Sequence, residues 1–287
     1  MSIPIALVLG GHGLLGQALL QQLAASGWAA RSLTREECNL LNPVELRERI
    51  EFIAPNVIFN AAAWTNIETA EAHPEEALSL NRGLPAMLGS LVKGTDIRLV
   101  HYSTAQVFNG RQDKPYTEKD RPDPLSVYAR TKLAGETALQ ELCLENCCII
   151  RTSCLFGPGR ENVVSAIIKL ARSKGELKVV HDLVGSPTYT PDLARASLRL
   201  LEKNASGLFH VVNSGQASWC ELAAETIRLA NVPSTVRGIP ASEWKHAAPR
   251  PAHAMLDTGK YAACVGSPLR PWPQALRDYV FANFLAH

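Results

Sequence analysis

A glycine-rich turn at the start of the chain limits the folds available to it. Residues 8–16 read VLGGHGLLG, with an apolar run before them and a helix-length segment after them. Gly11, Gly13 and Gly16 fit the spacing G-x-G-x-x-G, whereas Gly10, Gly13 and Gly16 fit G-x-x-G-x-x-G. Such a turn in a first βαβ unit lets backbone N–H groups approach a pyrophosphate. It predicts dinucleotide binding, with a tight turn that holds no ligand as the alternative.

Apolar runs alternate with amphipathic segments through the first half of the chain, as in repeated βαβ units. The runs are apolar throughout, which is typical of parallel strands covered by helices on both faces. The predicted strands are IALVLG, AARSL, NVIFNA, RLVHYS and CCIIRT. We therefore expect an α/β fold with a Rossmann-type doubly wound parallel sheet.

Helix start signals support this pattern. Asn42 before Pro43, with Glu45 closing a capping box, predicts a helix to about Ile53, and a second helix is expected from Pro124 to about Glu145. After Arg151 the pattern loosens. There we expect helices over 163–173 and from Thr190 and Ser218, strands LKVV and LFHVV, and an irregular Pro-rich stretch over 232–251. The expected domains are 1–152, binding NAD(P), and 153–287, a smaller substrate-binding lobe with segments returning to the first domain.

Composition narrows the choice of partners. Apolar residues make up 46% of the chain and charged residues 20%, which is ordinary for a globular protein. The net charge is +2 and the basic residues are scattered, so we expect no nucleic-acid or membrane partner and favour a small molecule. Seven cysteines without repeated C-x-x-C spacing indicate neither a disulfide framework nor a metal site. A cytoplasmic location follows from this cysteine usage.

The end of the second strand bears on the choice of cofactor. It carries RSLTREE where NAD sites usually place an acid that binds the ribose. Thr34 and Arg35 could hold a 2'-phosphate, which favours NADP. NAD stays possible if Glu36 or Glu37 turns inwards and Arg35 is a solvated surface charge.

Three short segments together indicate proton-transfer chemistry. Tyr128 and Lys132 are four residues apart on a predicted helix and share a face. A nearby ammonium favours the phenolate, so Lys132 is expected to lower the pKa of Tyr128, and it can also hold the nicotinamide ribose. Ser103 and Thr104 end the fourth strand, where open parallel sheets bind ligands, and NAAAWT over 60–65 lets backbone approach a cofactor. The alternative for Tyr128 and Lys132 is a pair of side chains on the protein surface. The alternative for Thr104 is a hydroxyl at the strand end that caps the next turn.

In this order, the motifs resemble the dTDP-4-dehydrorhamnose reductases, extended short-chain dehydrogenases that reduce the 4-keto group of a nucleotide-linked deoxysugar. The shared stretches are the G-x-x-G-x-x-G turn, NAAAWTNIETAE, HYST followed by VF, VYARTKLAGE, RTS followed by LFG, GSPTYTPDLA and the closing RPW. The resemblance spans nearly the whole chain. It implies an NADPH-dependent enzyme that forms dTDP-rhamnose, with Tyr128 as proton donor, Lys132 as its electrostatic partner and Thr104 as a donor to the carbonyl. A homodimer is compatible with it.

The resemblance also implies the cofactor site. Its register would be Gly10, Gly13 and Gly16, with Gly11 as a permissive neighbour and the His12 side chain close to the phosphates. Asn39 stands where the family often has Asp, and it still offers an amide to adenine. The expected cofactor-binding residues are Gly10, His12, Gly13, Leu14, Leu15, Gly16, Arg35, Asn39, Leu40, Ala61, Ala62, Ala63, Ser103, Tyr128 and Lys132.

The chain departs from the family at several presumed sugar contacts. Ala105 and Gln106 replace the Asp and Tyr of S-T-D-Y-V-F, and Cys154 replaces the Trp of R-T-S-W. His253 and Ala254 stand where Asn and Ser are common. Because Ala105 and Gln106 provide no acid pair after the Thr, the sequence argues against a dehydratase. A non-catalytic NADP-binding regulatory subunit and a nucleotide-sugar epimerase remain as alternatives to the reductase.

Overall fold

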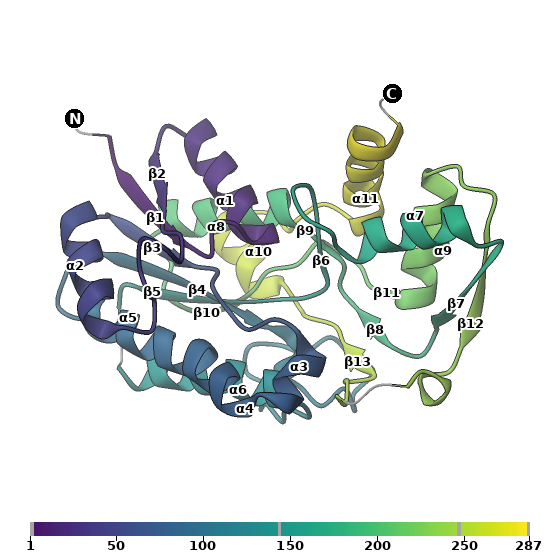
Figure 1. Cartoon of the computed structure of the whole chain (residues 1–287), viewed down its shortest axis with the longest axis horizontal. Helices are drawn as coiled ribbons and strands as arrows, with labels where there is room; N and C mark the ends of the chain where they lie inside the picture. Colours follow the sequence, from purple (N-terminus) through teal and green to yellow (C-terminus); the bar gives the residue numbers. More distant parts are fainter. Residues whose placement is uncertain (1–2, 143–144, 246–247, 286–287) are drawn as a thin grey trace.

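A six-stranded parallel sheet lies at the centre of the larger of two lobes (Figure 1). The structure is a computed structural model that describes residues 3–142, 145–245 and 248–285. The strands lie in the order β10-β5-β4-β3-β1-β2, and every neighbouring pair is parallel. Their bounds are β1 Ile5–Leu9, β2 Ala29–Ser32, β3 Val57–Asn60, β4 Arg98–Thr104, β5 Cys147–Thr152 and β10 Gly207–His210. The predicted doubly wound parallel sheet is confirmed, and its first five strands lie within one residue of the predicted bounds.

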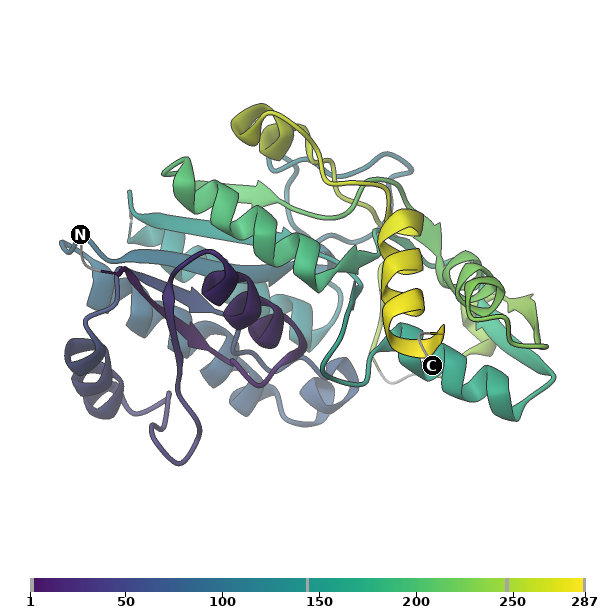
Figure 2. The same cartoon turned by 90° about the horizontal axis from the view of Figure 1, so that it is seen from above.

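Helices cover both faces of this sheet (Figures 1 and 2). One face is covered by α1 (Leu14–Ala25), α8 (Thr190–Glu202) and α10 (Gly259–Val265). The other is covered by α2 (Pro43–Ile53), α5 (Leu84–Val92) and α6 (Val127–Glu141). The short helices α3 (Ile67–Ala72) and α4 (Pro74–Leu78) and the π-helical turn η1 (Ser79–Gly83) lead into α5. Apolar strands are therefore buried on both sides, as their sequences predicted.

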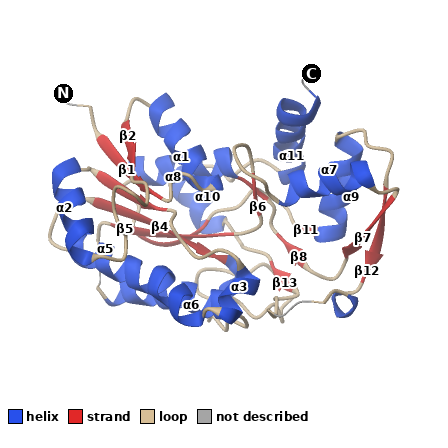
Figure 3. Ribbon diagram, viewed as in Figure 1, coloured by secondary structure: helices blue, strands red, loops and turns tan. Residues whose placement is uncertain are grey.

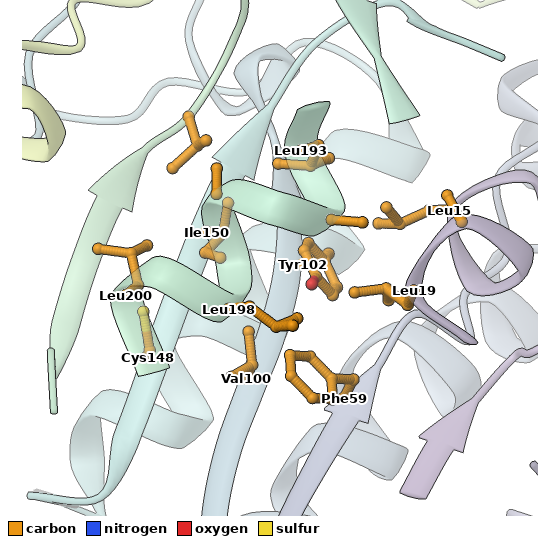
Figure 4. Packing of buried hydrophobic residues seen from close by; sticks show 14 of the residues in the cluster. Leu15, Leu19, Phe59, Val100, Tyr102, Cys148, Ile150, Leu193, Leu198 and Leu200 are labelled. Carbon is orange, nitrogen blue, oxygen red and sulfur yellow. The ribbon is translucent and has the colours of Figure 1, made fainter. Parts of the chain in front are cut away.

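The core on the α1 side joins segments that are far apart in the sequence (Figure 4). Leu15 and Leu19 of α1 and Leu193 and Leu198 of α8 belong to one buried cluster with Phe59 of β3. Helix α8 and strand β10 both come from beyond residue 152. The larger sheet and its core are thus completed by the second half of the chain.

The start of α2 confirms the predicted helix but not the predicted capping box. The Asn42 side chain accepts hydrogen bonds from the N–H groups of Val44 and Glu45, at 3.0 and 3.3 Å. Glu45 does not return to the N–H of Asn42, because that group already donates to the carbonyl of Asn39 at 2.9 Å. The Glu45 carboxylate instead accepts from the N–H of Asn39 and the amide of Asn42.

Helix α6 is shorter than predicted. It begins at Val127 because Ser126 caps it, accepting a hydrogen bond from the N–H of Ala129 at 3.2 Å. Pro124 lies before the helix, and the N–H of Asp123 is tied to the carbonyl of Val107 at 2.9 Å. The helix ends at Glu141, and residues 143–144 of the predicted span lie outside the described residues.

A smaller lobe lies to the right of the sheet in Figure 1. Its helices are α7 (Val163–Ser173), α9 (Trp219–Leu229) and α11 (Trp272–Val280), shown in blue in Figure 3. Its strands are β6 (Leu155–Phe156), β7 (Glu176–Val180), β8 (Val184–Gly185), β9 (Thr188–Tyr189), β11 (Ala217–Ser218), β12 (Thr235–Ile239) and β13 (His253–Ala254). Phe156, Ile168, Leu222, Trp272 and Tyr279 belong to its core.

The stretch 232–251 was predicted to be irregular, and this is wrong for β12. All five of its residues pair in parallel with β7. Pro233 and Pro240 lie just outside the strand, where a missing N–H removes no ladder hydrogen bond. The pairing depends on β7, which is more than fifty residues away in the sequence, so the local composition did not reveal it. Residues 246–247 of this stretch lie outside the described residues.

Candidate active site

The glycine turn touches the loop that follows β3. Gly10 has φ +78°, and a Cβ there would lie 2.7 Å from the backbone nitrogen of Ala62 and 2.8 Å from the carbonyl carbon of Ala61. Both segments leave the carboxyl ends of the adjacent strands β1 and β3. The order of strands reverses between these two strands, because β2 follows on one side and β4 on the other. Open α/β sheets bind ligands at such a point.

The start of α1 has unused hydrogen-bond donors. Gly13 is its N-cap and supplies no side-chain acceptor, so the N–H groups of the first turn lack a capping partner. The N–H of Gly13 closes the turn on the carbonyl of Gly10 at 2.8 Å. A helix start with free N–H groups beside a turn without side chains fits a pyrophosphate.

Gly11 is not a permissive neighbour, so this prediction is wrong. A Cβ at Gly11 would lie 2.7 Å from the Cβ of Ser32 on β2, and it would also overlap the Ser32 hydroxyl. A Cβ at Gly16 would lie 2.7 Å from the Cα of Gly11. The second glycine is thus required by the packing of β2 behind the turn, and both spacings are satisfied at once.

The other residues of the predicted phosphate turn differ in what they present. The His12 side chain is exposed, while its carbonyl accepts from the amide of Gln17 at 3.1 Å and from Arg160 at 3.4 Å. Leu14 is partly buried, and Leu15 is buried in the core on the α1 side, so it offers only backbone to a ligand.

The loop after β2 is folded on itself. The Glu37 carboxylate accepts from the N–H of Thr34 at 2.7 Å, and the Thr34 hydroxyl accepts from the N–H of Glu37 at 3.3 Å. Arg35 is exposed. The side-chain amide oxygen of Asn39 accepts from the N–H of Leu41 at 3.1 Å, and Leu40 packs against the core under α2. The carboxylate of Glu37 is therefore held within the loop, and Arg35 stays free to meet an anion.

Tyr128 and Thr104 meet at the carboxyl edge of the sheet. Tyr128 lies in the first turn of α6 and is hydrogen-bonded to Thr104, the last residue of β4. The Thr104 hydroxyl accepts from the N–H of Gln106 at 3.2 Å, so its own proton is available to donate. Burial raises the pKa of Tyr128, and the bond with Thr104 offsets only part of that rise. Tyr128 is therefore a protonated phenol near neutral pH.

The pKa of Tyr128 is raised overall, whereas the sequence predicted that Lys132 would lower it. The Nζ of Lys132 donates to the carbonyl of Tyr102 at 2.5 Å, and the lysine side chain is 2% exposed. Burial lowers the pKa of Lys132 to about 8, while the carboxylate of Glu136 acts in the opposite direction. The desolvation of both groups outweighs the interaction expected between them.

Ser103 and the alanines after β3 lie at the same edge. The Ser103 hydroxyl donates to the Glu136 carboxylate in the interior. Ala61 packs partly on the α1 side of the sheet and Ala62 on the α2 side, and Ala63 is partly buried. The three small side chains let this loop lie against the glycine turn.

Sequence reasoning missed Asn81, which fixes this loop to α6. The buried Asn81 side chain accepts from the N–H of Trp64 at 2.8 Å and donates to its carbonyl at 3.1 Å. It also donates to the Thr131 hydroxyl at 3.0 Å, and Thr131 in turn donates to the carbonyl of Tyr128 at 2.8 Å. Asn81 lies in the π-helical turn η1, a feature frequent at functional sites. A single Asn in a helical segment gave no sequence signal.

The positions at which the chain departs from the family lie in the short helix η2 (Ala105–Val107), between β5 and β6, and in β13. Ala105 is buried beside Val107 in η2, whereas Gln106 is only partly buried. Cys154 has φ +44° and packs partly against the core of the smaller lobe. His253 lies 3.1 Å from the carboxylate of Asp113.

Other ligand types find no support in the described residues. The six described cysteines are free, and Cys143 lies outside that set. No group of three or more His, Cys, Asp or Glu side chains among the described residues could hold a metal ion. In the same part of the chain, no helix is both long and apolar enough to cross a membrane.

A doubly wound sheet with a glycine turn at its switch point, with Thr104 at the end of β4 and with Tyr128 and Lys132 on α6, defines the class of extended short-chain dehydrogenases. Within this class, the chain belongs to the dTDP-4-dehydrorhamnose reductase family. The family model described as the RmlD substrate binding domain matches residues 5–284.

Relatives and solved structures support this membership. The chain is 36% identical to the spore coat polysaccharide biosynthesis protein SpsK of Bacillus subtilis, over 96% of each chain. It is 34% identical to a dTDP-4-dehydrorhamnose reductase of Streptomyces griseus, over 96% of this chain and 92% of the other. A crystal structure of dTDP-4-dehydrorhamnose reductase from Bacillus anthracis in complex with NADP has a TM-score of 0.94 and 28% identity, covering 98% of this chain and 100% of the other.

Proposed function

We propose that this chain reduces the 4-keto group of a dTDP-linked 6-deoxysugar with NADPH, as in the formation of dTDP-rhamnose. The observation that carries the proposal is the hydrogen-bonded pair of Thr104 and Tyr128, with Lys132 one turn further along α6. The Streptomyces griseus relative is named for this reaction, and the Bacillus anthracis structure holds NADP. Tyr128 and Lys132 together have no use in a purely binding subunit.

Thr104, Tyr128 and Lys132 each have a different role in the proposed reduction. NADPH supplies the hydride when it is bound. Thr104 donates a hydrogen bond to the C4 carbonyl oxygen of the sugar, and Tyr128 gives that oxygen its phenolic proton. Its raised pKa keeps this proton in place at neutral pH. The positive charge of Lys132 stabilises the phenolate that remains.

The residues that would hold the cofactor fit its parts. The pyrophosphate would lie on the free N–H groups at the start of α1, because Gly10 and Gly13 present no side chain there. Lys132 would hold the nicotinamide ribose. The exposed Arg35 would meet the 2'-phosphate, which supports NADP over NAD.

The proposal also covers the two domains, the location in the cell and the oligomeric state. Residues 1–152 would bind NADP, and residues 153–287 would bind the nucleotide-sugar and return segments to the sheet. A cytoplasmic location is supported by the free state of the six described cysteines. A homodimer is kept as a proposal, which sedimentation of the purified chain would decide.

The test is reduction of the dTDP-4-keto sugar, followed as loss of NADPH absorbance. In Tyr128→Phe, kcat should fall by roughly 10²–10⁴-fold, because the phenolic proton donor is lost. Tyr279→Phe is the matched control: Tyr279 is a buried tyrosine of the smaller lobe whose hydroxyl accepts from Asn162 at 2.8 Å. Equal rates in Tyr128→Phe and the unaltered chain would refute the assigned mechanism.

A further inference from the structure

A network of buried polar side chains extends from α6, the helix that carries Tyr128 and Lys132, to β10. Glu136 is fully buried and Arg151 of β5 is 2% exposed. Arg151 donates through Nε to Oε1 of Glu136 at 2.9 Å and through Nη2 to Oε2 at 2.6 Å. The Ser103 hydroxyl donates to Oε1 as well. Three donors from two strands therefore fix the carboxylate in one position.

His210, at the β10 end of this network, is neutral. Nδ1 of His210 lies 3.0 Å from the carbonyl of Tyr116, which places its proton there and leaves Nε2 as an acceptor. Nε2 lies 3.5 Å from Nη1 of Arg151. Burial and then the charge of Arg151 lower the pKa of His210 to about 3. The Arg151 guanidinium also lies 5.0 Å above the ring of Phe108.

The buried charges do not cancel. Lys132 and Arg151 are positive and Glu136 is negative, so these three buried groups together carry one net positive charge. Glu136 lies four residues after Lys132 on the same face of α6, and its carboxylate favours the charged form of Lys132. Lys132 would otherwise lose its proton more readily, because burial alone lowers its pKa.

The other titratable groups around α6 do not take over this role. His101 of β4 is buried, and burial and the charge of Lys132 lower its pKa, so it is neutral. Glu71 of α3 is bound to the N–H of Val127 at 2.7 Å. Arg82 of η1 lines a pocket on the outer side of α6 with Arg130 and Glu141.

We propose that Glu136 is a positioning residue that keeps Lys132 protonated, and that Arg151 and Ser103 hold its carboxylate in place for this purpose. Stability alone does not account for the ion pair, because a well-packed apolar pair of similar volume is often as stable. The consequence for catalysis rests on the proposed function, since the phenolate left by proton transfer needs a charged Lys132 beside it. The effect on the charge of Lys132 does not rest on it.

The variants distinguish an effect of the Glu136 charge on Lys132 from a general loss of packing. Glu136→Gln/Arg151→Gln removes both charges together, because either one left alone in the interior is strongly destabilising. Glu136→Asp keeps the charge and is the conservative control. Arg151→Gln removes the guanidinium and leaves the Glu136 carboxylate to act on Lys132. The pKa of Lys132 should therefore rise in this variant, whereas it should fall in the double variant. A general loss of packing would not produce opposite shifts.

The first measurement uses the chain without cofactor. The midpoint of thermal unfolding is followed from pH 6 to pH 11 for each variant, with and without Lys132→Met. Because the folded pKa of Lys132 is about 8 and its ordinary value is 10.5, the unfolded chain holds more protons between them, and the Lys132-dependent stability rises with pH there. In the double variant this rise should start about one pH unit lower, in Arg151→Gln higher, and in Glu136→Asp unchanged. The same onset in the double variant and the unaltered chain would overturn the proposal.

The second measurement is the pH profile of kcat/KM for the keto sugar with NADPH. Its alkaline limb should move about one pH unit to lower pH in the double variant and stay in place in Glu136→Asp. Absence of reduction in every chain, with the thermal shifts present, would refute the proposed function and leave the role of Glu136 standing. Reduction with an unmoved alkaline limb in the folded double variant would refute the role of Glu136 alone.

Discussion

At the scale of the residue, three of the four glycines of the first turn are required by three different neighbours. Gly10 faces the backbone of Ala62, Gly11 faces the side chain of Ser32, and Gly16 faces the turn itself. The sequence showed four glycines and left two spacings to choose between. Only the positions of β2 and β3 beside β1 reveal that both spacings are satisfied, because the neighbours lie about twenty and fifty residues further along the chain.

Gly11→Ala should destabilise the chain by about 1–3 kcal/mol, because the added Cβ overpacks against Ser32. It should also weaken NADPH binding, since α1 would shift at its start. Denaturant unfolding and a fluorescence titration with NADPH measure the two effects. Gly83→Ala is the control, because a Cβ there meets nothing within 4 Å. Unchanged stability of Gly11→Ala would show that β2 does not pack on the turn as described.

His210 should make the chain sensitive to acid. Its folded pKa of about 3 is below the ordinary 6.5, so the unfolded chain binds more protons between these values, and stability falls as the pH falls through that window. The loss from this one group reaches about 3 kcal/mol by pH 4. In His210→Gln the loss is absent, so the difference in thermal midpoint from the unaltered chain should narrow from pH 7 to pH 4. His181→Gln, at an exposed histidine, should leave the difference constant.

At the scale of the element, helix starts were the most predictable features. The N-cap of α9 is Ser218, which accepts from the N–H of Glu221 at 3.1 Å, while the Glu221 side chain accepts from the N–H of Ser218 at 2.7 Å. This pattern is local, so it could be read from the sequence. The start of α6 was predicted three residues too early, although its cap is local as well: the Ser126 side chain accepts from the N–H of Ala129.

Ser218→Ala should cost about 1 kcal/mol of stability, because one N–H at the start of α9 loses its acceptor. Chemical denaturation gives the change. Thr258→Ala serves as the control at α10, where the N-cap side chain makes no capping hydrogen bond. Equal losses at the two caps would contradict the assignment.

At the scale of the whole molecule, the two halves of the chain share one core. Strand β10 pairs with β5 over four residues, and α8 packs beside α1 on the same face of the sheet (Figure 2). The sequence indicated returning segments, but it did not show which ones join the sheet. Strand pairing is decided by burial and register over long separations, which local patterns do not contain.

A fragment that ends at residue 152 should therefore not fold alone. It would lack α8 and β10, which cover Leu15 and Leu19 and supply His210 to Arg151. We expect aggregation or a loss of near-ultraviolet circular dichroism, and recovery when residues 153–287 are produced in the same cells. A monomeric 1–152 fragment with a sharp thermal transition would contradict the shared core.

The sequence by itself determined the parallel sheet, the order of its first five strands along the chain, the glycine turn and the spacing of Tyr128 and Lys132. These features follow from periodicity, turn residues and caps, which act over a few residues. The tertiary structure decided which strands are neighbours, the contact of Gly11 with Ser32, the β12–β7 pair and the protonation of the catalytic groups. The last of these follows from burial: desolvation raises the pKa of Tyr128 and lowers that of Lys132. Burial is set by what packs around each group, and much of that packing comes from distant parts of the chain.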